Sequence, residues 1–181
     1  VDFDADDRMY YRCTGGTTGD LYRDDQLVST NVVAEFGGVF DNGLIIYHGF
    51  EEYRVLDPDG IELNKYETPT GWTALEDATT ISGNTAYMLW VDHTDSAKPV
   101  YVVMKYDDAG FKELGRITPV EPPPGNFGSG HRLDPSGALY VALDGKVRRY
   151  DPDGTSTIVW TMSTDISVHA NDELVYYPGA K

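Results

Sequence analysis

The stretch VRRYDPDG at residues 147–154 decides the fold, because two other parts of the chain end in nearly the same way. The sequence reads YRVLDPDG at 53–60 and VMKYDDAG at 103–110. Each begins with β-branched and aromatic residues, which favour strands, and ends in an acidic turn. Pro presets φ, Asp bonds its own backbone, and Gly adopts a positive φ. The stretch therefore predicts a hairpin turn, and its recurrence predicts a repeated unit.

Five strand-like runs set the length of this unit. They read RMYYRCT, GLIIYHG, TAYMLWV, ALYVALD and ELVYYPG, and their second residues are separated by 35, 42, 53 and 35 positions. The mean of about 41 matches the period of a four-stranded propeller blade. A short Asp, Asn or Gly turn precedes each run, further strand-like runs follow, and helical periodicity is nearly absent. The pattern predicts an all-β protein, a β-propeller of four-stranded antiparallel meander blades, at residues 1–31, 32–68, 69–118, 119–163 and, in part, 164–181.

Two features of the repeat leave alternatives open. The uneven spacing is also compatible with a β-sandwich or a barrel. Four and a half blades do not close a ring, and an open sheet edge exposes unpaired backbone groups. We therefore expect this chain to be a segment of a larger propeller or assembly.

The charge of the chain restricts its partners. The formal net charge is −16, with 30 acidic and 14 basic residues. Nucleic acids and anionic lipids bind through Lys and Arg, so we exclude nucleic acid as a partner. The apolar runs are too short to cross a bilayer, so we exclude membrane insertion. The acidic residues have three interpretations: turn chemistry, calcium binding, and adaptation to a saline medium.

The stretch LYVALDGKVRRYDPDG at 139–154, extended upstream by LDPSGALYVAL at 133–143, resembles the repeats of NHL-like and gluconolactonase-like propellers. The resemblance is at the level of the superfold, which hosts enzymes, sugar binders, scaffolds and virus components. Propeller hydrolases and lactonases hold a metal ion on the axis with ligands from inner strands. The residues that would supply that set here are Glu35, His131, His169 and Asn171, with Asp134 and Asp172 at the adjoining turns.

Two groups of residues are candidate metal ligands. His131 and His169 occupy similar places in neighbouring repeats and would bind a transition metal in the channel, or else are ordinary polar residues at strand ends. Asp2, Asp4 and Asp6 alternate in DFDADD, which puts their carboxylates on one side of an extended segment. In a loop form the same stretch would wrap Ca²⁺, or else it is a solvated acidic turn. The possible cofactor is therefore Ca²⁺.

Aromatic residues are the candidate ligand-binding groups. Trp72, Trp90, Trp160 and Phe127 would form a platform for a sugar, or else most of them pack between blades. Trp72 and Phe127 are the candidates for contact with a protein or carbohydrate partner. Cys13 is interpreted as a small buried residue. The sequence contains no nucleophile elbow, Walker loop, zinc spacing or dinucleotide fingerprint.

Two functions fit these observations. The first is a non-catalytic propeller module for binding or assembly, in an extracellular, cell-surface or viral tail protein. The alternative is a gluconolactonase-like hydrolase or lyase with a divalent ion on the propeller axis. Three or four converging ligands would favour the second function.

Overall fold

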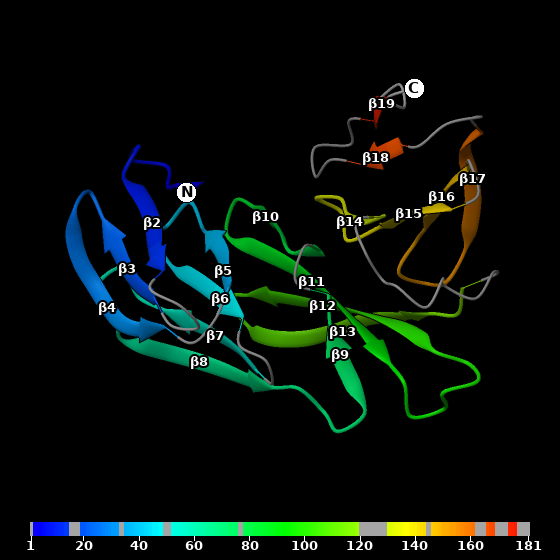
Figure 1. Cartoon of the computed structure of the whole chain (residues 1–181), viewed down its shortest axis with the longest axis horizontal. Helices are drawn as coiled ribbons and strands as arrows, with labels where there is room; N and C mark the ends of the chain where they lie inside the picture. The colour runs from blue at the N-terminus through cyan, green and yellow to red at the C-terminus, as the bar shows by residue number, and fades with distance from the viewer. Residues whose placement is uncertain are drawn as a thin grey trace. The chain divides into compact units, whose positions relative to one another are not determined.

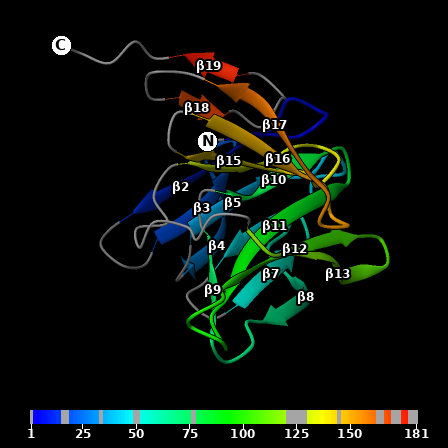
Figure 2. The same ribbon diagram turned by 90° about the vertical axis from the view of Figure 1, so that its right-hand side faces the viewer.

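The computed structural model describes residues 2–14, 19–32, 35–48, 52–75, 78–119, 130–143, 146–161, 166–168 and 174–176. None of these residues forms an α-helix. The strands form five sheets in which neighbouring strands follow one another along the chain, with one exception in the third sheet. Figures 1 and 2 show these strands as consecutive hairpins, with colour advancing steadily from one sheet to the next.

The sheets are numbered in chain order. Sheet 1 contains β1 (Asp2–Phe3), β2 (Met9–Thr14), β3 (Gly19–Arg23) and β4 (Gln26–Val32). Sheet 2 contains β5 (Glu35–Val39), β6 (Ile45–His48), β7 (Glu52–Leu56) and β8 (Glu62–Glu67). Sheet 3 contains β10 (Thr80–Ser82), β11 (Thr85–Asp92), β12 (Val100–Asp107) and β13 (Gly110–Ile117), and also β9 (Trp72–Ala74). Sheet 4 contains β14 (His131–Leu133), β15 (Leu139–Leu143), β16 (Lys146–Tyr150) and β17 (Ser156–Thr161), and sheet 5 contains β18 (Ile166–Val168) and β19 (Leu174–Tyr176).

The predicted all-β class and the four-stranded antiparallel meanders are confirmed. The prediction for the third repeat was incomplete, because it did not include β9. This strand pairs with the last residues of β11, in the register Trp90↔Ala74, Val91↔Thr73 and Asp92↔Trp72. Three residues are too short a run to show an alternating pattern, so this strand could not be predicted from the sequence.

The repeated acidic stretches are hairpin turns that join the third strand of a sheet to the fourth. In the first, Asp57 N donates to Ile61 O at 2.8 Å and Gly60 N donates to Asp57 O at 3.0 Å. In the second, Asp151 N donates to Thr155 O and Gly154 N donates to Asp151 O, both at 2.8 Å. The φ angles of Gly60 and Gly154 are +85° and +86°, as this turn requires. The sequence prediction of a turn at each site is confirmed.

The same hydrogen-bond pattern joins the first strand to the second in three sheets. These turns start at Asp4, Phe40 and Asp134. The fourth residue of the turn is Gly43 in the turn that starts at Phe40 and Gly137 in the turn that starts at Asp134, with φ of +80° and +81°. In the turn that starts at Asp4 it is Asp7, with φ of +59°. One turn geometry therefore recurs at both ends of these sheets, with and without glycine.

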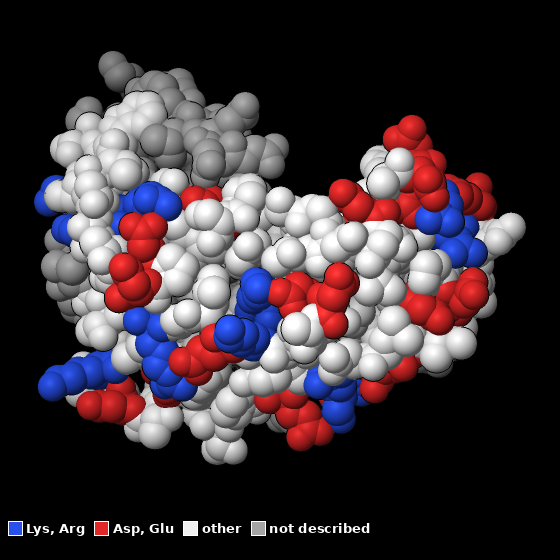
Figure 3. Space-filling view, turned by 180° about the vertical axis from the view of Figure 1, so that it is seen from behind, with Lys and Arg blue, Asp and Glu red and all other residues white. Residues whose placement is uncertain are grey.

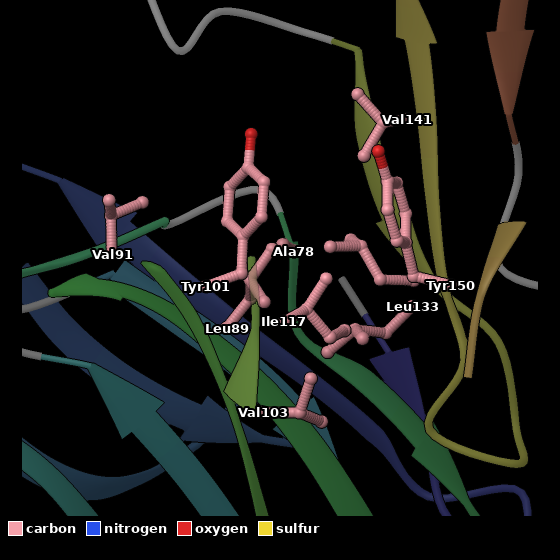
Figure 4. Packing of buried hydrophobic residues seen from close by; sticks show 10 residues of the cluster. Ala78, Leu89, Val91, Tyr101, Val103, Ile117, Leu133, Val141 and Tyr150 are labelled. Carbon is pink, nitrogen blue, oxygen red and sulfur yellow. The ribbon is translucent and has the colours of Figure 1, made fainter. Parts of the chain in front are cut away.

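The chain divides into two compact units, which are described separately. The first consists of Val1–Pro69, Ile81–Ala86 and Asp107–Phe111, and the second of Thr70–Thr80, Tyr87–Tyr106 and Lys112–Lys181. In the first unit, Tyr10 and Leu21 of sheet 1 pack with residues of sheet 2, namely Val39, Ile45, Tyr47 and Leu56. In the second unit, sheets 3 and 4 share a core that includes Leu89, Val91, Tyr101, Val103, Ile117, Leu133, Leu139, Val141 and Tyr150 (Figure 4).

Turns also pack against the preceding sheet within each unit. Arg23 Nη1 donates to Pro58 O at 2.7 Å, which ties the first acidic hairpin to sheet 1. A Cβ placed on Gly60 would lie 2.4 Å from Val28 O of β4. A Cβ placed on Gly115 of β13 would lie 1.8 Å from Pro152 O of the second acidic hairpin. The third-to-fourth turn of a later sheet thus contacts the fourth strand of the sheet before it, once in each unit.

Candidate functional site

Trp72 lies at an edge of sheet 3, where strand pairing fixes its backbone. It is paired directly with Asp92 of β11, so both side chains emerge on the same face of the sheet. His93 N donates to Gly71 O at 2.8 Å, which continues the pairing beyond the strand. Trp72 is half-buried. This strand pairing presents part of a large aromatic ring to solvent from a rigid position.

Arg116 of β13 lies over the ring of Trp72. Its guanidinium carbon is 5.1 Å from the ring centroid, within the range of a cation–π interaction. Nε and Nη2 donate to the two carboxylate oxygens of Glu113 at 3.0 and 3.1 Å. Nη1 donates to Asp92 Oδ2 at 3.0 Å. Two carboxylates therefore hold the guanidinium in place beside the tryptophan.

Asp92 and Arg116 are both charged at neutral pH. Hydrogen bonds from Thr94 and Arg116 lower the pKa of Asp92, and they outweigh the opposing effect of burial. The hydrogen bond to Glu113 is the main cause that raises the pKa of Arg116. The side chain of Asp92 is mostly buried, whereas those of Glu113 and Arg116 are more than two-fifths exposed. The cluster thus presents fixed acceptors and donors to solvent.

These four residues, Trp72, Asp92, Glu113 and Arg116, are called the Trp72 cluster below. A carboxylate has about four lone-pair sites, so Glu113 and Asp92 retain acceptor capacity when bonded to Arg116. An aromatic ring offers an apolar surface with little conformational entropy to lose on binding. The arrangement suits a ligand that has both an apolar face and several hydroxyl groups. The sequence pointed to Trp72 but not to its neighbours, because Arg116 lies 44 positions further along the chain.

His131 lies in a buried contact with Tyr101. Its Nε2 is 2.6 Å from the hydroxyl oxygen of Tyr101. Burial lowers the pKa of His131 to about 4, so the ring is neutral at neutral pH. Burial also raises the pKa of Tyr101. In Figure 4 the hydroxyl groups of Tyr101 and Tyr150 point to the same side of the core, away from Val103. Nε2, one of the two ring nitrogens that can ligate a metal, is therefore engaged by a tyrosine, and the predicted second ligand, His169, lies outside the described residues.

Asp2, Asp4 and Asp6 do not share one side of an extended segment. Asp4 is the first residue of a turn, and its Oδ1 accepts from Asp6 N and Arg8 N, each at 3.0 Å. Its Oδ2 accepts from Arg8 Nε at 2.7 Å and from the Tyr10 hydroxyl at 3.1 Å. Asp2 Oδ2 instead accepts from Val39 N at 2.9 Å. The expectation that DFDADD aligns its carboxylates is wrong, because the strand ends at Phe3 and the chain turns at Asp4.

The described part of the chain contains no group of three or more His, Cys, Asp or Glu side chains that could hold a metal ion. Of the remaining candidates, Phe127, Asn171 and Asp172 lie outside the described residues, as does the side chain of Glu35. Asp134 is buried at the start of a turn, where its Oδ1 accepts from Ser136 N and Ala138 N. Trp90 is fully buried. Cys13 was expected to be buried and is exposed instead.

Several charged side chains elsewhere on the surface form ion pairs. Arg54 Nη1 lies 3.0 Å from Glu62 Oε2, and Lys65 Nζ lies 2.8 Å from Glu67 Oε1. On the face shown in Figure 3, basic and acidic groups lie side by side in several places. No helix long and apolar enough to cross a membrane was found in the part of the chain that the structure describes.

Comparisons with known proteins give a fold relationship without a family. No family model matches the sequence. No curated protein matches it either. Among solved structures, the chain is similar to a protein of unknown function from Bacteroides caccae, whose crystal structure was determined at 1.35 Å resolution. The TM-score is 0.56 at 16% identity, and the match covers 92% of this chain. The chain spans 63% of the length of that protein. The likeness concerns the fold alone.

Proposed function

We propose that this chain is a β-propeller module that binds carbohydrate without catalysing a reaction, and that the Trp72 cluster is its binding site. The observation that carries the proposal is the half-buried ring of Trp72 beside two carboxylates and a guanidinium, all on paired strands. A sugar ring has an apolar face that stacks on an aromatic ring. Its hydroxyl groups donate to carboxylates and accept from Arg, which matches the groups present.

The propeller part of the proposal is supported by the repeat. Successive four-stranded meanders carry the same turn between the same strands, and the third-to-fourth turn contacts the preceding sheet in both units. We infer that the chain is a segment of a larger propeller. An extracellular or virion location belongs to the same proposal, and the formal net charge of −16 would keep the chain hydrated there.

A printed array of neutral oligosaccharides, probed with fluorescently labelled protein, tests the proposal. We expect the wild-type chain to bind a subset of the glycans. Trp72→Ala removes the stacking surface and should abolish binding, whereas Trp72→Phe should retain part of it. Glu113→Gln keeps the shape of the side chain but weakens the hydrogen bond from Arg116, so it should reduce affinity.

Trp160→Ala provides the matched control. Trp160 is another partly exposed tryptophan on a strand, but it belongs to sheet 4 and lies outside the Trp72 cluster. Its removal should leave glycan binding unchanged, and circular dichroism checks that each variant is folded. The proposal is wrong if the wild-type chain binds no glycan, or if folded Trp72→Ala binds as well as wild type.

A further inference from the structure

The Trp72 cluster carries more negative than positive charge. Asp92 and Glu113 supply two carboxylates, and Arg116 supplies the single guanidinium that both of them contact. One cation against two anions gives the cluster a formal charge of −1. The side chain of Glu113 is 41% exposed, against 15% for Asp92. A ligand that reaches this cluster from solvent therefore meets an accessible carboxylate.

Neighbouring charged residues do not offset this negative charge. In the loop after β11, Asp95 and Lys98 are both exposed and have opposite charges. Lys112 precedes Glu113 on β13, and successive side chains of a strand emerge on opposite faces. The whole chain has a formal net charge of −16. The field at the cluster therefore attracts cations and repels anions.

The cation of the cluster is already engaged by its two carboxylates. Nε and Nη2 of Arg116 donate to Glu113, and Nη1 donates to Asp92. An anionic ligand would have to approach this guanidinium beside two groups of like charge, which is unfavourable. The carboxylates, in contrast, retain lone pairs that can accept from an ammonium group. The same hydrogen bonds thus favour a cationic ligand over an anionic one.

We infer that the Trp72 cluster is specific for amino sugars in their protonated form, and that Glu113 binds the ammonium group. This inference rests on the proposed carbohydrate-binding function and adds the class of sugar. The apolar face of the sugar ring contacts Trp72, as that of a neutral sugar does, and the ammonium group donates to Glu113. A uronic acid brings a carboxylate into the same field and is repelled.

The test compares cellotetraose with the glucosamine and glucuronic acid tetramers of the same linkage. These ligands share ring configuration and differ in whether they carry hydroxyl groups alone, amines or carboxylates. Isothermal titration calorimetry at moderate salt and mildly acidic pH, where the amines are protonated, measures the affinity of each. We expect the glucosamine tetramer to bind about threefold more tightly than cellotetraose, the order of effect of one exposed ion pair, and the glucuronic acid tetramer to bind most weakly.

Glu113→Gln should bring the affinities for the glucosamine tetramer and cellotetraose close together, because it removes the charge that distinguishes them. The readout is the ratio of the two affinities, which a general loss of binding does not change. Glu62→Gln is the matched control: Glu62 is 42% exposed and lies 3.0 Å from Arg54, as Glu113 is 41% exposed and lies 3.0 Å from Arg116. It changes the charge of the chain equally but should leave the ratio unchanged. Circular dichroism checks that both variants are folded.

Tetralysine carries amines without a sugar ring, and it tests whether the charge of the chain alone attracts the ligand. It should bind more weakly than the glucosamine tetramer. Trp72→Ala should abolish binding of the glucosamine tetramer, because the apolar face of the sugar then has no ring to contact. Tetralysine that binds as tightly as the glucosamine tetramer overturns the inference.

The remaining outcomes separate this inference from the proposed function. If cellotetraose and the glucosamine tetramer bind equally through Trp72, or if the preference survives Glu113→Gln, the specificity for amino sugars is wrong and carbohydrate binding stands. If neither tetramer binds, the inference is overturned. The array of neutral glycans then decides separately whether the Trp72 cluster binds carbohydrate.

Discussion

The hairpins 57–60 and 151–154 have the same sequence, Asp-Pro-Asp-Gly, and nearly the same backbone, but their surroundings differ. At Gly60 an added Cβ would lie 2.4 Å from the carbonyl oxygen of Val28. At Gly154 the nearest such atom is Arg116 O, at 3.7 Å. The second hairpin approaches its neighbour through Pro152 instead, and the glycine that permits this is Gly115 on the other sheet. Local sequence thus determines the turn, whereas packing determines which glycine is sterically required.

The two hairpins also differ in the carboxylate that caps the turn. Asp57 Oδ1 accepts from Asp59 N at 2.9 Å and from Ile61 N at 2.8 Å. In the second hairpin Asp153 Oδ1 accepts from Thr155 N at 2.8 Å, and Asp151 Oδ1 lies 2.8 Å from Arg149 Nη2. Two sequence differences accompany this change. Arg149 lies beside Asp151, and Thr155 stands where the first hairpin has Ile61. Two turns of identical sequence can therefore use different aspartates to accept hydrogen bonds from the backbone N–H groups.

Replacing the glycine of each hairpin by alanine should give the largest difference in stability between the two hairpins. Gly154→Ala places Cβ at a positive φ but in open space, and should lower the free energy of unfolding by about 1 kcal/mol. Gly60→Ala adds a clash with a backbone oxygen that cannot move alone, and should cost about 3 kcal/mol in total. Urea denaturation followed by circular dichroism measures both values. An equal loss of unfolding free energy in the two variants would show that the close approach to Val28 does not constrain Gly60.

Asp7 offers a smaller test of the same turn, because it occupies the position that glycine holds in both acidic hairpins. Its φ is +59°, which an aspartate adopts less readily than glycine does. Asp7→Gly should therefore stabilise the protein by up to about 1 kcal/mol, an effect opposite in sign to that of Gly154→Ala. The midpoint of urea denaturation should rise with an unchanged slope. A lower midpoint would mean that the carboxylate of Asp7 contributes more than its backbone strain costs.

The features that could be predicted from the sequence are those determined locally. The acidic hairpins follow from Pro, Asp and Gly in order, and the strands follow from runs such as YMLWV and VYVVM. What could not be predicted depends on residues distant in the sequence. Tyr101 and His131 are 30 positions apart, and Trp72 meets Arg116 only after the sheet has formed. Asp4 looked like a metal ligand because a sequence shows the carboxylate but not the five-residue turn that encloses it.

The pKa of Asp153 provides the smallest and most local comparison. Hydrogen bonds from the backbone and then the side chain of Thr155 lower this pKa from its ordinary value of 3.8, and they outweigh the opposing effect of burial. Because the folded pKa is depressed, the stabilisation is present above pH 3.8 and is lost as the pH falls through the lower folded value.

Thr155→Ile gives the second hairpin the residue that the first has at position 61. It removes the hydroxyl but keeps the backbone N–H, so the pKa of Asp153 should rise part of the way towards 3.8. Carbon-detected NMR titration of the carboxyl group measures this shift. A titration midpoint that does not move would mean that the backbone N–H of Thr155 alone lowers the pKa. Threonine at this position would then not explain why the two hairpins use different carboxylates as caps, and Arg149 would remain as the cause.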